Sequence, residues 1–77
     1  MVKRVQIKAA RIMIGWSQDR LASEAGLTRQ TILALETGRT KVSKESREAV
    51  LKVLDEYGIT FYNQTGIMSV ELNEEDD

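Results

Sequence analysis

The 77-residue sequence contains no cysteine, no histidine and no proline. The absence of cysteine excludes disulfide bonds and cysteine nucleophiles. The absence of cysteine and histidine together excludes zinc sites built from these two ligands, and the absence of histidine excludes serine–histidine triads. The longest apolar run, residues 12–16, is far too short to span a membrane, and residues 1–4 lead into no long apolar stretch. We therefore expect a soluble, cytoplasmic protein with no membrane partner and no signal peptide. A chain of this length forms one small domain that buries only about 60 % of its unfolded surface, so a second subunit would help it.

Basic residues are absent from the last third of the chain. Residues 1–52 carry all eleven lysines and arginines and five acids, a net charge of +6, whereas residues 53–77 carry seven acids and no base. The overall charge of −1 does not reveal this asymmetry, because the two parts nearly cancel. It favours a basic body that binds a polyanion and an acidic tail, although composition alone is equally consistent with ordinary solvated surface charge.

The spacing of apolar residues predicts four helices before residue 58. Serine and threonine residues suited to N-caps precede three of them, at Ser17, Thr28 and Ser43. Glycines suited to ending a helix follow all four, at Gly15, Gly26, Gly38 and Gly58. The apolar positions expected to face the core are Ile7, Ala10, Ile14, Leu21, Ala22, Ala25, Leu27, Ile32, Leu35, Val50, Leu51 and Leu54.

After Gly58 the pattern changes from helical spacing to alternation. Residues 59–62 and 68–72 are typical of strands, and residues 63–66 between them are typical of a turn in which Gly66 takes a positive φ. The sequence therefore predicts a β-hairpin over residues 59–72. A two-stranded hairpin is marginally stable alone, so it must dock on the helices, pair with another chain, or do both.

One face of this hairpin is a candidate dimerisation surface. It carries five apolar side chains: Ile59, Phe61, Met68, Val70 and Leu72. Two hairpins that pair edge to edge would form a four-stranded sheet and cover exposed strand edges. The alternative, that this face covers the chain's own fourth helix, remains equally open. The acidic residues 73–77 are expected to form a disordered tail.

Three segments place particular residue types at a particular spacing: WSQDRLA at 16–22, AGLTRQTI at 25–32 and LETGR at 35–39. A small residue, Ala22, suits a close approach of two helices, and Gly26 suits the sharp turn between them. Over residues 7–57 this pattern resembles the helix-turn-helix family of phage repressor and Cro type (Xre). The resemblance implies a mainly α fold, a four-helix lambda-repressor-like DNA-binding domain over residues 1–58. The family usually continues into a short fifth helix, where this sequence predicts a strand.

The resemblance also implies which residues contact DNA. In this family the exposed side of the third helix lies in the major groove. Its candidate base contacts are Thr28, Arg29, Gln30, Leu33 and Ala34. Candidate phosphate contacts are Gln18, Arg39, Thr40, Lys41 and Lys44. Arginine can bind guanine, glutamine can bind adenine and apolar side chains can meet a thymine methyl. The alternative for each residue is ordinary solvated surface. Lys3, Arg4 and Lys8 could add a flexible basic arm, but ordinary surface is the favoured interpretation for these three.

Two further residues have a structural interpretation. The resemblance implies that Arg11 in the first helix and Glu36 in the third pair across the core. Such a buried pair adds little net stability, but the loss of one partner is costly. Arg11 is therefore expected to support the fold rather than to contact DNA.

The sequence thus indicates a regulator of transcription that binds double-stranded DNA, a prokaryotic or phage repressor that acts as a homodimer on a near-palindromic operator. Two alternatives remain open. One is an antitoxin whose acidic C-terminal segment binds a toxin, and the other is a helix-turn-helix module that bridges proteins. No enzyme activity and no cofactor are implied, and the carboxylates of Asp76 and Asp77 lack a preorganised cage for a metal.

Overall fold

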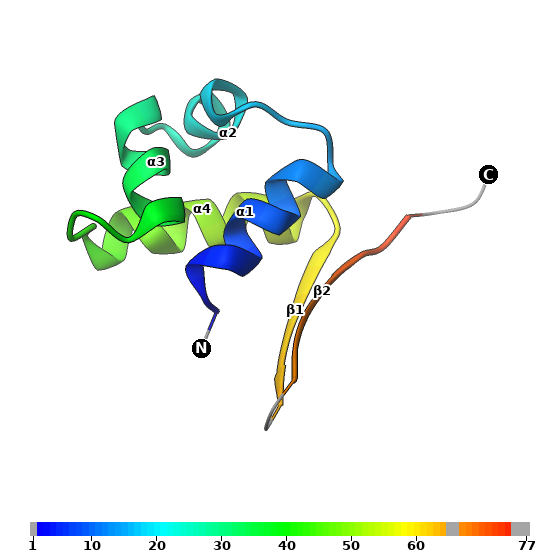
Figure 1. Cartoon of the computed structure of the whole chain (residues 1–77). Helices are drawn as coiled ribbons and strands as arrows, with labels where there is room; N and C mark the ends of the chain where they lie inside the picture. Colours follow the sequence, from blue (N-terminus) through cyan, green and yellow to red (C-terminus); the bar gives the residue numbers. More distant parts are fainter. Residues whose placement is uncertain (1, 65–66, 75–77) are drawn as a thin grey trace.

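The computed structural model describes residues 2–64 and 67–74, in which four helices precede a two-stranded antiparallel sheet (Figure 1). These elements are α1 (Arg4–Met13), α2 (Gln18–Ala25), α3 (Arg29–Thr37), α4 (Lys44–Glu56), β1 (Ile59–Gln64) and β2 (Ile67–Leu72). The predicted fold class, four helices and a C-terminal hairpin, is confirmed. Gly66 and residues 75–77, for which a turn and a disordered tail are predicted, lie outside the described residues.

The predicted helix ends are confirmed. Each of the three expected caps accepts a hydrogen bond from a backbone N–H three residues later: Ser17 from Arg20 at 3.0 Å, Thr28 from Thr31 at 3.2 Å and Ser43 from Ser46 at 3.1 Å. Gly26 ends α2 with a φ of +70°, a left-handed conformation that costs glycine little. It turns the chain within the few residues that separate α2 from α3, so the two helices meet at a fixed angle.

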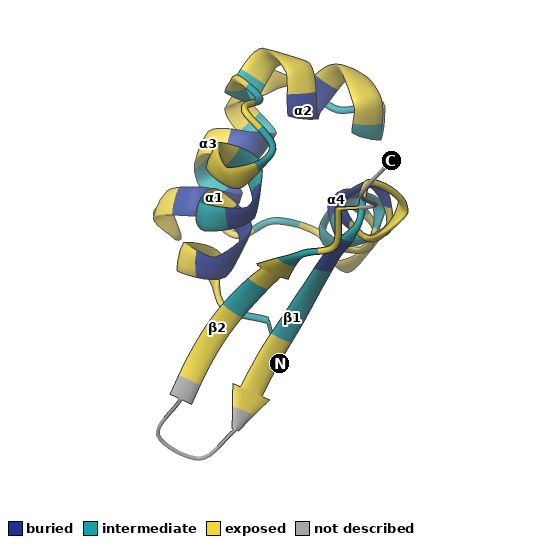
Figure 2. Cartoon of the chain, turned by 90° about the vertical axis from the view of Figure 1, so that its right-hand side faces the viewer, coloured by how far each residue is buried: buried dark blue, intermediate teal, exposed yellow. Residues whose placement is uncertain are grey.

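The core lies between the four helices and the base of the hairpin (Figure 2). It contains Ile7, Ala10, Leu21, Ala22, Ile32, Leu35, Val50, Val53, Leu54 and Ile59. Removal of these apolar side chains from water supplies the main stabilising free energy. The predicted inner faces are largely those observed, except that Val53 is buried while Ile14, Ala25, Leu27 and Leu51 are half-buried around the core.

The hairpin extends away from the helices, and a buried glutamine fixes its direction (Figure 1). The Gln6 side-chain amide on α1 donates to the carbonyl oxygens of Tyr62 on β1, at 3.2 Å, and Ser69 on β2, at 3.0 Å. Its own carbonyl oxygen accepts from the backbone N–H of Lys3 at 2.7 Å. One side chain therefore joins both strands to the first turn of α1. Both strands are longer than predicted: β1 ends two residues later than expected, and β2 begins one residue earlier.

Candidate nucleic-acid interface

A buried ion pair holds α3 against α1. Arg11 Nε donates to Glu36 Oε2 at 2.7 Å, and Arg11 Nη2 donates to Glu36 Oε1 at 3.1 Å. The two side chains are 12 % and 2 % exposed, respectively. Arg11 Nη1 donates to the carbonyl oxygen of Trp16 at 2.8 Å, and Gln18 Nε2 donates to Glu36 Oε1 at 3.2 Å. The structure thus places Arg11 and Glu36 together, and their bonds tie α1, the start of α2 and α3 to one another.

The opposite side of α3 faces outward. Ile32, Leu35 and Glu36 are buried, whereas Gln30 is exposed and Leu33 is 47 % exposed although its side chain is apolar. This side of the helix is therefore open to solvent.

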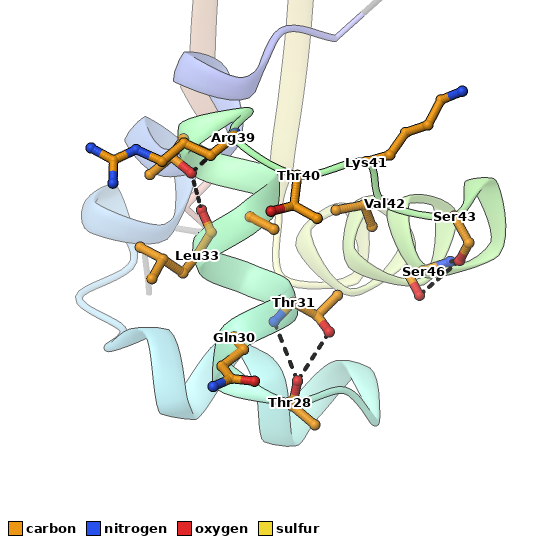
Figure 3. A pocket seen from close by; sticks show the side chains of 12 residues that line it. Thr28, Gln30, Thr31, Leu33, Arg39, Thr40, Lys41, Val42, Ser43 and Ser46 are labelled. Atoms are coloured by element: carbon orange, nitrogen blue, oxygen red, sulfur yellow. Dashed lines mark hydrogen bonds between the residues drawn. The ribbon is translucent and has the colours of Figure 1, made fainter.

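A groove of about 550 Å³ runs between α3 and the loop that leads into α4 (Figure 3). Four of the five candidate base-contacting residues line it, namely Thr28, Gln30, Leu33 and Ala34. Arg29 is exposed at the first position of α3 but does not line the groove. The Thr28 hydroxyl already serves as the cap of α3 and lies 3.0 Å from the Thr31 hydroxyl.

The candidate phosphate contacts divide into two places. Arg39, Thr40 and Lys41 are exposed and line the groove from the loop, and Lys44 is exposed at the start of α4 just beyond it. Gln18 is half-buried at the start of α2, with its amide on Glu36. The loop therefore gathers positive charge beside the exposed side of α3, and Gln18 lies at the other edge of that helix.

Further residues line the groove that the sequence analysis does not identify: Thr31, Thr37, Val42, Ser43 and Ser46. Thr37 follows Gln30 by seven residues and Leu33 by four, a spacing that repeats on one side of a helix and that identifies it in the sequence. Its hydroxyl donates to the carbonyl oxygen of Leu33 at 2.8 Å and accepts from the Arg39 N–H at 3.5 Å. Thr37 thereby contacts the backbone of Arg39, the first basic residue of the loop between α3 and α4.

The five apolar hairpin residues do not share one free surface. Ile59 is part of the core, and Phe61, Val70 and Leu72 are half-buried against it. Met68 is 49 % exposed and, with Met13 of α1, lines a groove of about 400 Å³ between α1 and β2. Four of the five side chains therefore pack against the chain's own core, and Met68 is the one of the five with an exposed side chain.

Within residues 2–64 and 67–74, no group of three or more acidic side chains lies together as a metal site would require. Among the same residues, none of the helices combines the length and the apolar character needed to cross a membrane.

Comparison with known proteins identifies a family to which the chain is similar. The model of helix-turn-helix domains of Cro/C1 type matches residues 7–61, which include all four helices but the first turn of α1 and reach into β1. None of the curated proteins compared with the chain is significantly similar to it.

Proposed function

Because this chain belongs to the Cro/C1-type helix-turn-helix family of DNA-binding regulators, we propose that it is a repressor that binds a near-palindromic operator as a dimer. The observation that carries the proposal is the groove along α3. It combines an outward Gln30 and Leu33 with the basic residues Arg39 and Lys41, and none of the described residues that line it is acidic. A surface of this kind complements a base edge flanked by phosphates.

The proposed base contacts follow from the chemistry of the side chains. The Gln30 amide can donate to N7 and accept from N6 of one adenine, and the methyl groups of Leu33 and Ala34 can meet a thymine methyl. Arg29 stands at the N-terminal end of α3, outside the groove, where it can reach a guanine at the edge of the half-site. Thr28 both caps the helix and lies in the groove, so we assign it a supporting contact.

The proposed phosphate contacts lie at both edges of α3. Arg39, Thr40, Lys41 and Lys44 supply one edge. At the other, Gln18 Nε2 carries two hydrogens, of which one donates to Glu36, so the second can donate to a phosphate without loss of the first bond. Phosphate contacts on both sides hold the helix in register on the base pairs.

We propose a dimer because one recognition helix contacts only a few base pairs, too few to specify a site in a genome. Two copies related by a two-fold axis place two such helices about one DNA turn apart. We propose that the two copies meet at the groove between α1 and β2, where Met68 and Met13 expose apolar surface, since a two-fold interface uses the same patch on both subunits. A dimer bound to the operator represses transcription because it keeps polymerase from the promoter.

The experiment measures binding to a duplex selected from a randomised pool. Gln30→Ala is expected to cost about 1–3 kcal/mol of binding free energy and to relax the preference at one base position. Ser23→Ala, an exposed position on α2 that lines no groove along α3, is the control and is expected to bind as the wild type does. Equal affinity and equal sequence preference of Gln30→Ala and wild type would refute the assigned base contact.

The dimer has its own test. Met68→Glu places a charge in the groove between α1 and β2 and is expected to convert the dimer to a monomer in analytical ultracentrifugation. A wild-type chain that sediments as a monomer with and without its DNA site contradicts the proposed dimer. Purification of a second protein with the wild type but not with Met68→Glu would instead favour the antitoxin.

A further inference from the structure

A second groove, of about 400 Å³, continues the surface along α3 toward the start of the chain. It shares Ala34, Thr40 and Val42 with the first groove. Its remaining lining residues are Val2, Lys3, Arg4, Leu35, Gly38 and Arg47. The first residues of the chain therefore lie beside the C-terminal end of α3, the helix that we assign to the major groove.

These first residues are held in place by hydrogen bonds. Arg47 Nη2 on α4 donates to the carbonyl oxygen of Val2. The backbone N–H of Lys3 donates to Gln6 Oε1 at 2.7 Å, and the Lys3 carbonyl oxygen accepts from the Gln6 N–H at 2.9 Å. Because the backbone is already ordered, a ligand that binds here does not have to immobilise it, and binding loses less entropy.

Arg4 lies across Gly38. A Cβ atom built at Gly38 would be 3.0 Å from Arg4 Cδ, 3.1 Å from Nη1 and 3.3 Å from Nε, so the arginine occupies the space that a side chain would fill. Gly38 ends α3 with a φ of +71°. The guanidinium group is thus positioned at the end of the recognition helix, while Arg4 remains exposed to solvent.

The charge of this surface has one sign. The two grooves are lined by five basic residues, Lys3, Arg4, Arg39, Lys41 and Arg47, and by no acidic one among the described residues. Neither Lys3 nor Arg4 forms an ion pair with any residue of the described part of the chain. A positive charge near the C-terminal end of α3 also interacts favourably with the helix dipole. The dipole explains the position of Arg4, but it does not explain a continuous basic surface without acids.

We propose that Arg4 binds a phosphate of the DNA backbone and extends the interface beyond the C-terminal end of α3. This inference rests on the proposed function, because it assigns a further contact to the same bound DNA. It replaces the interpretation of Arg4 as ordinary surface charge.

The test compares Arg4→Gln, Arg4→Lys and the wild type on the selected duplex across a salt series. Each phosphate contact contributes about 0.9 to the slope of log affinity against log salt, so Arg4→Gln is expected to lower the slope by about 0.9 for each bound protomer. Between roughly 50 and 200 mM salt, the affinity advantage of the wild type over Arg4→Gln then shrinks about 3-fold per protomer. Arg4→Lys keeps the charge and is expected to restore the slope. Lys52→Gln removes the same charge from α4 at a position that lines neither groove, and is expected to leave the slope unchanged.

A melting curve for each variant separates the two roles of Arg4. If Arg4→Gln melts lower but keeps the wild-type slope, Arg4 acts on the helix dipole alone and the phosphate contact is refuted. If Arg4→Gln and Lys52→Gln lower the slope equally, the effect is one of overall charge and the proposal also fails. A wild type that binds no duplex at all overturns the proposed function itself, and this result differs from both of the others.

Discussion

Replacement of Arg11 by methionine leaves the carboxylate of Glu36 buried without its charged partner. The methionine removes three hydrogen bonds, two to Glu36 and one to the Trp16 carbonyl oxygen, and Glu36 keeps the 3.2 Å bond from Gln18. Removal of one partner of a buried ion pair typically costs about 3–5 kcal/mol. A chain of 77 residues has an unfolding free energy of roughly 4–12 kcal/mol, so Arg11→Met loses a large part of it.

Urea-induced unfolding followed by circular dichroism measures this loss. In thermal unfolding the same change is expected to lower the midpoint by at least about 12 °C. The matched control is Arg20→Met, because Arg20 pairs with Glu24 at 3.0 Å on the surface, where its side chain is 52 % exposed. This exposed pair, with its contact to the Trp16 ring, is expected to contribute about 1 kcal/mol or less.

The double variant Arg11→Met with Glu36→Leu tests the cause of the loss. It removes both charges and is expected to recover most of the stability, since a buried ion pair is often no better than apolar residues of similar size. If Arg11→Met costs no more than Arg20→Met, or if the double variant is less stable than Arg11→Met alone, the buried carboxylate is not the source of the effect and the reasoning is refuted.

Three other outcomes are expected. Gly26→Ala should cost about 1–2 kcal/mol in urea unfolding from its left-handed backbone alone, since no atom of the described residues beyond its two chain neighbours lies within 4 Å of the added Cβ. A Gly26→Asn variant as unstable as Gly26→Ala would contradict this cause. Gln6→Met should speed hydrogen exchange of the hairpin amides and leave those of α3 protected, because the bonds to both strands are lost; unchanged exchange would contradict the role of Gln6. The hydrogen bond to the Glu71 carboxylate, with its negative charge, raises the pKa of Tyr62 above the usual 10.0, so the folded state favours the protonated phenol. The associated stability is present below the unfolded pKa of about 10 and is lost as the pH rises through the folded pKa. Glu71→Gln in a Tyr57→Phe background should return the phenolate absorbance transition toward 10.0, and an unmoved transition would refute the assignment.

The helix ends could be predicted from the sequence because their causes are local. Ser17 and Thr28 accept bonds from N–H groups three residues away, and Gly26 takes its left-handed conformation within the same short segment. Spacing along one helix was likewise sufficient to separate the buried Ile32 from the exposed Leu33.

The features that were missed depend on residues far apart in the chain. Gln6 lies among apolar core positions, and its partners, Tyr62 and Ser69, are 56 and 63 residues away, so no local pattern indicates that it holds the hairpin. The alternation of residues in β2 shows that Met68 and Val70 share a face. Val70 is half-buried because it packs against the core, whereas Met68 lies nearer the turn and is 49 % exposed.

The candidate interface shows the same division. Helical spacing places Gln30 on the outward side of α3, where the structure has it. The groove beside Gln30 and the contact of Arg4 with Gly38 follow instead from the packing of the α3–α4 loop and of α1 around that helix. These are tertiary arrangements that the spacing of residues along the chain does not contain.

The central claim, that α3 recognises a base sequence as part of a dimer, is tested most directly when the 77-residue chain selects bound duplexes from a randomised pool. The account predicts that a near-palindrome is enriched, with half-sites about one DNA turn apart and with an affinity that falls steeply as salt rises. A pool that remains random after repeated selection, even at low salt, would show that α3 does not recognise bases and would contradict the account.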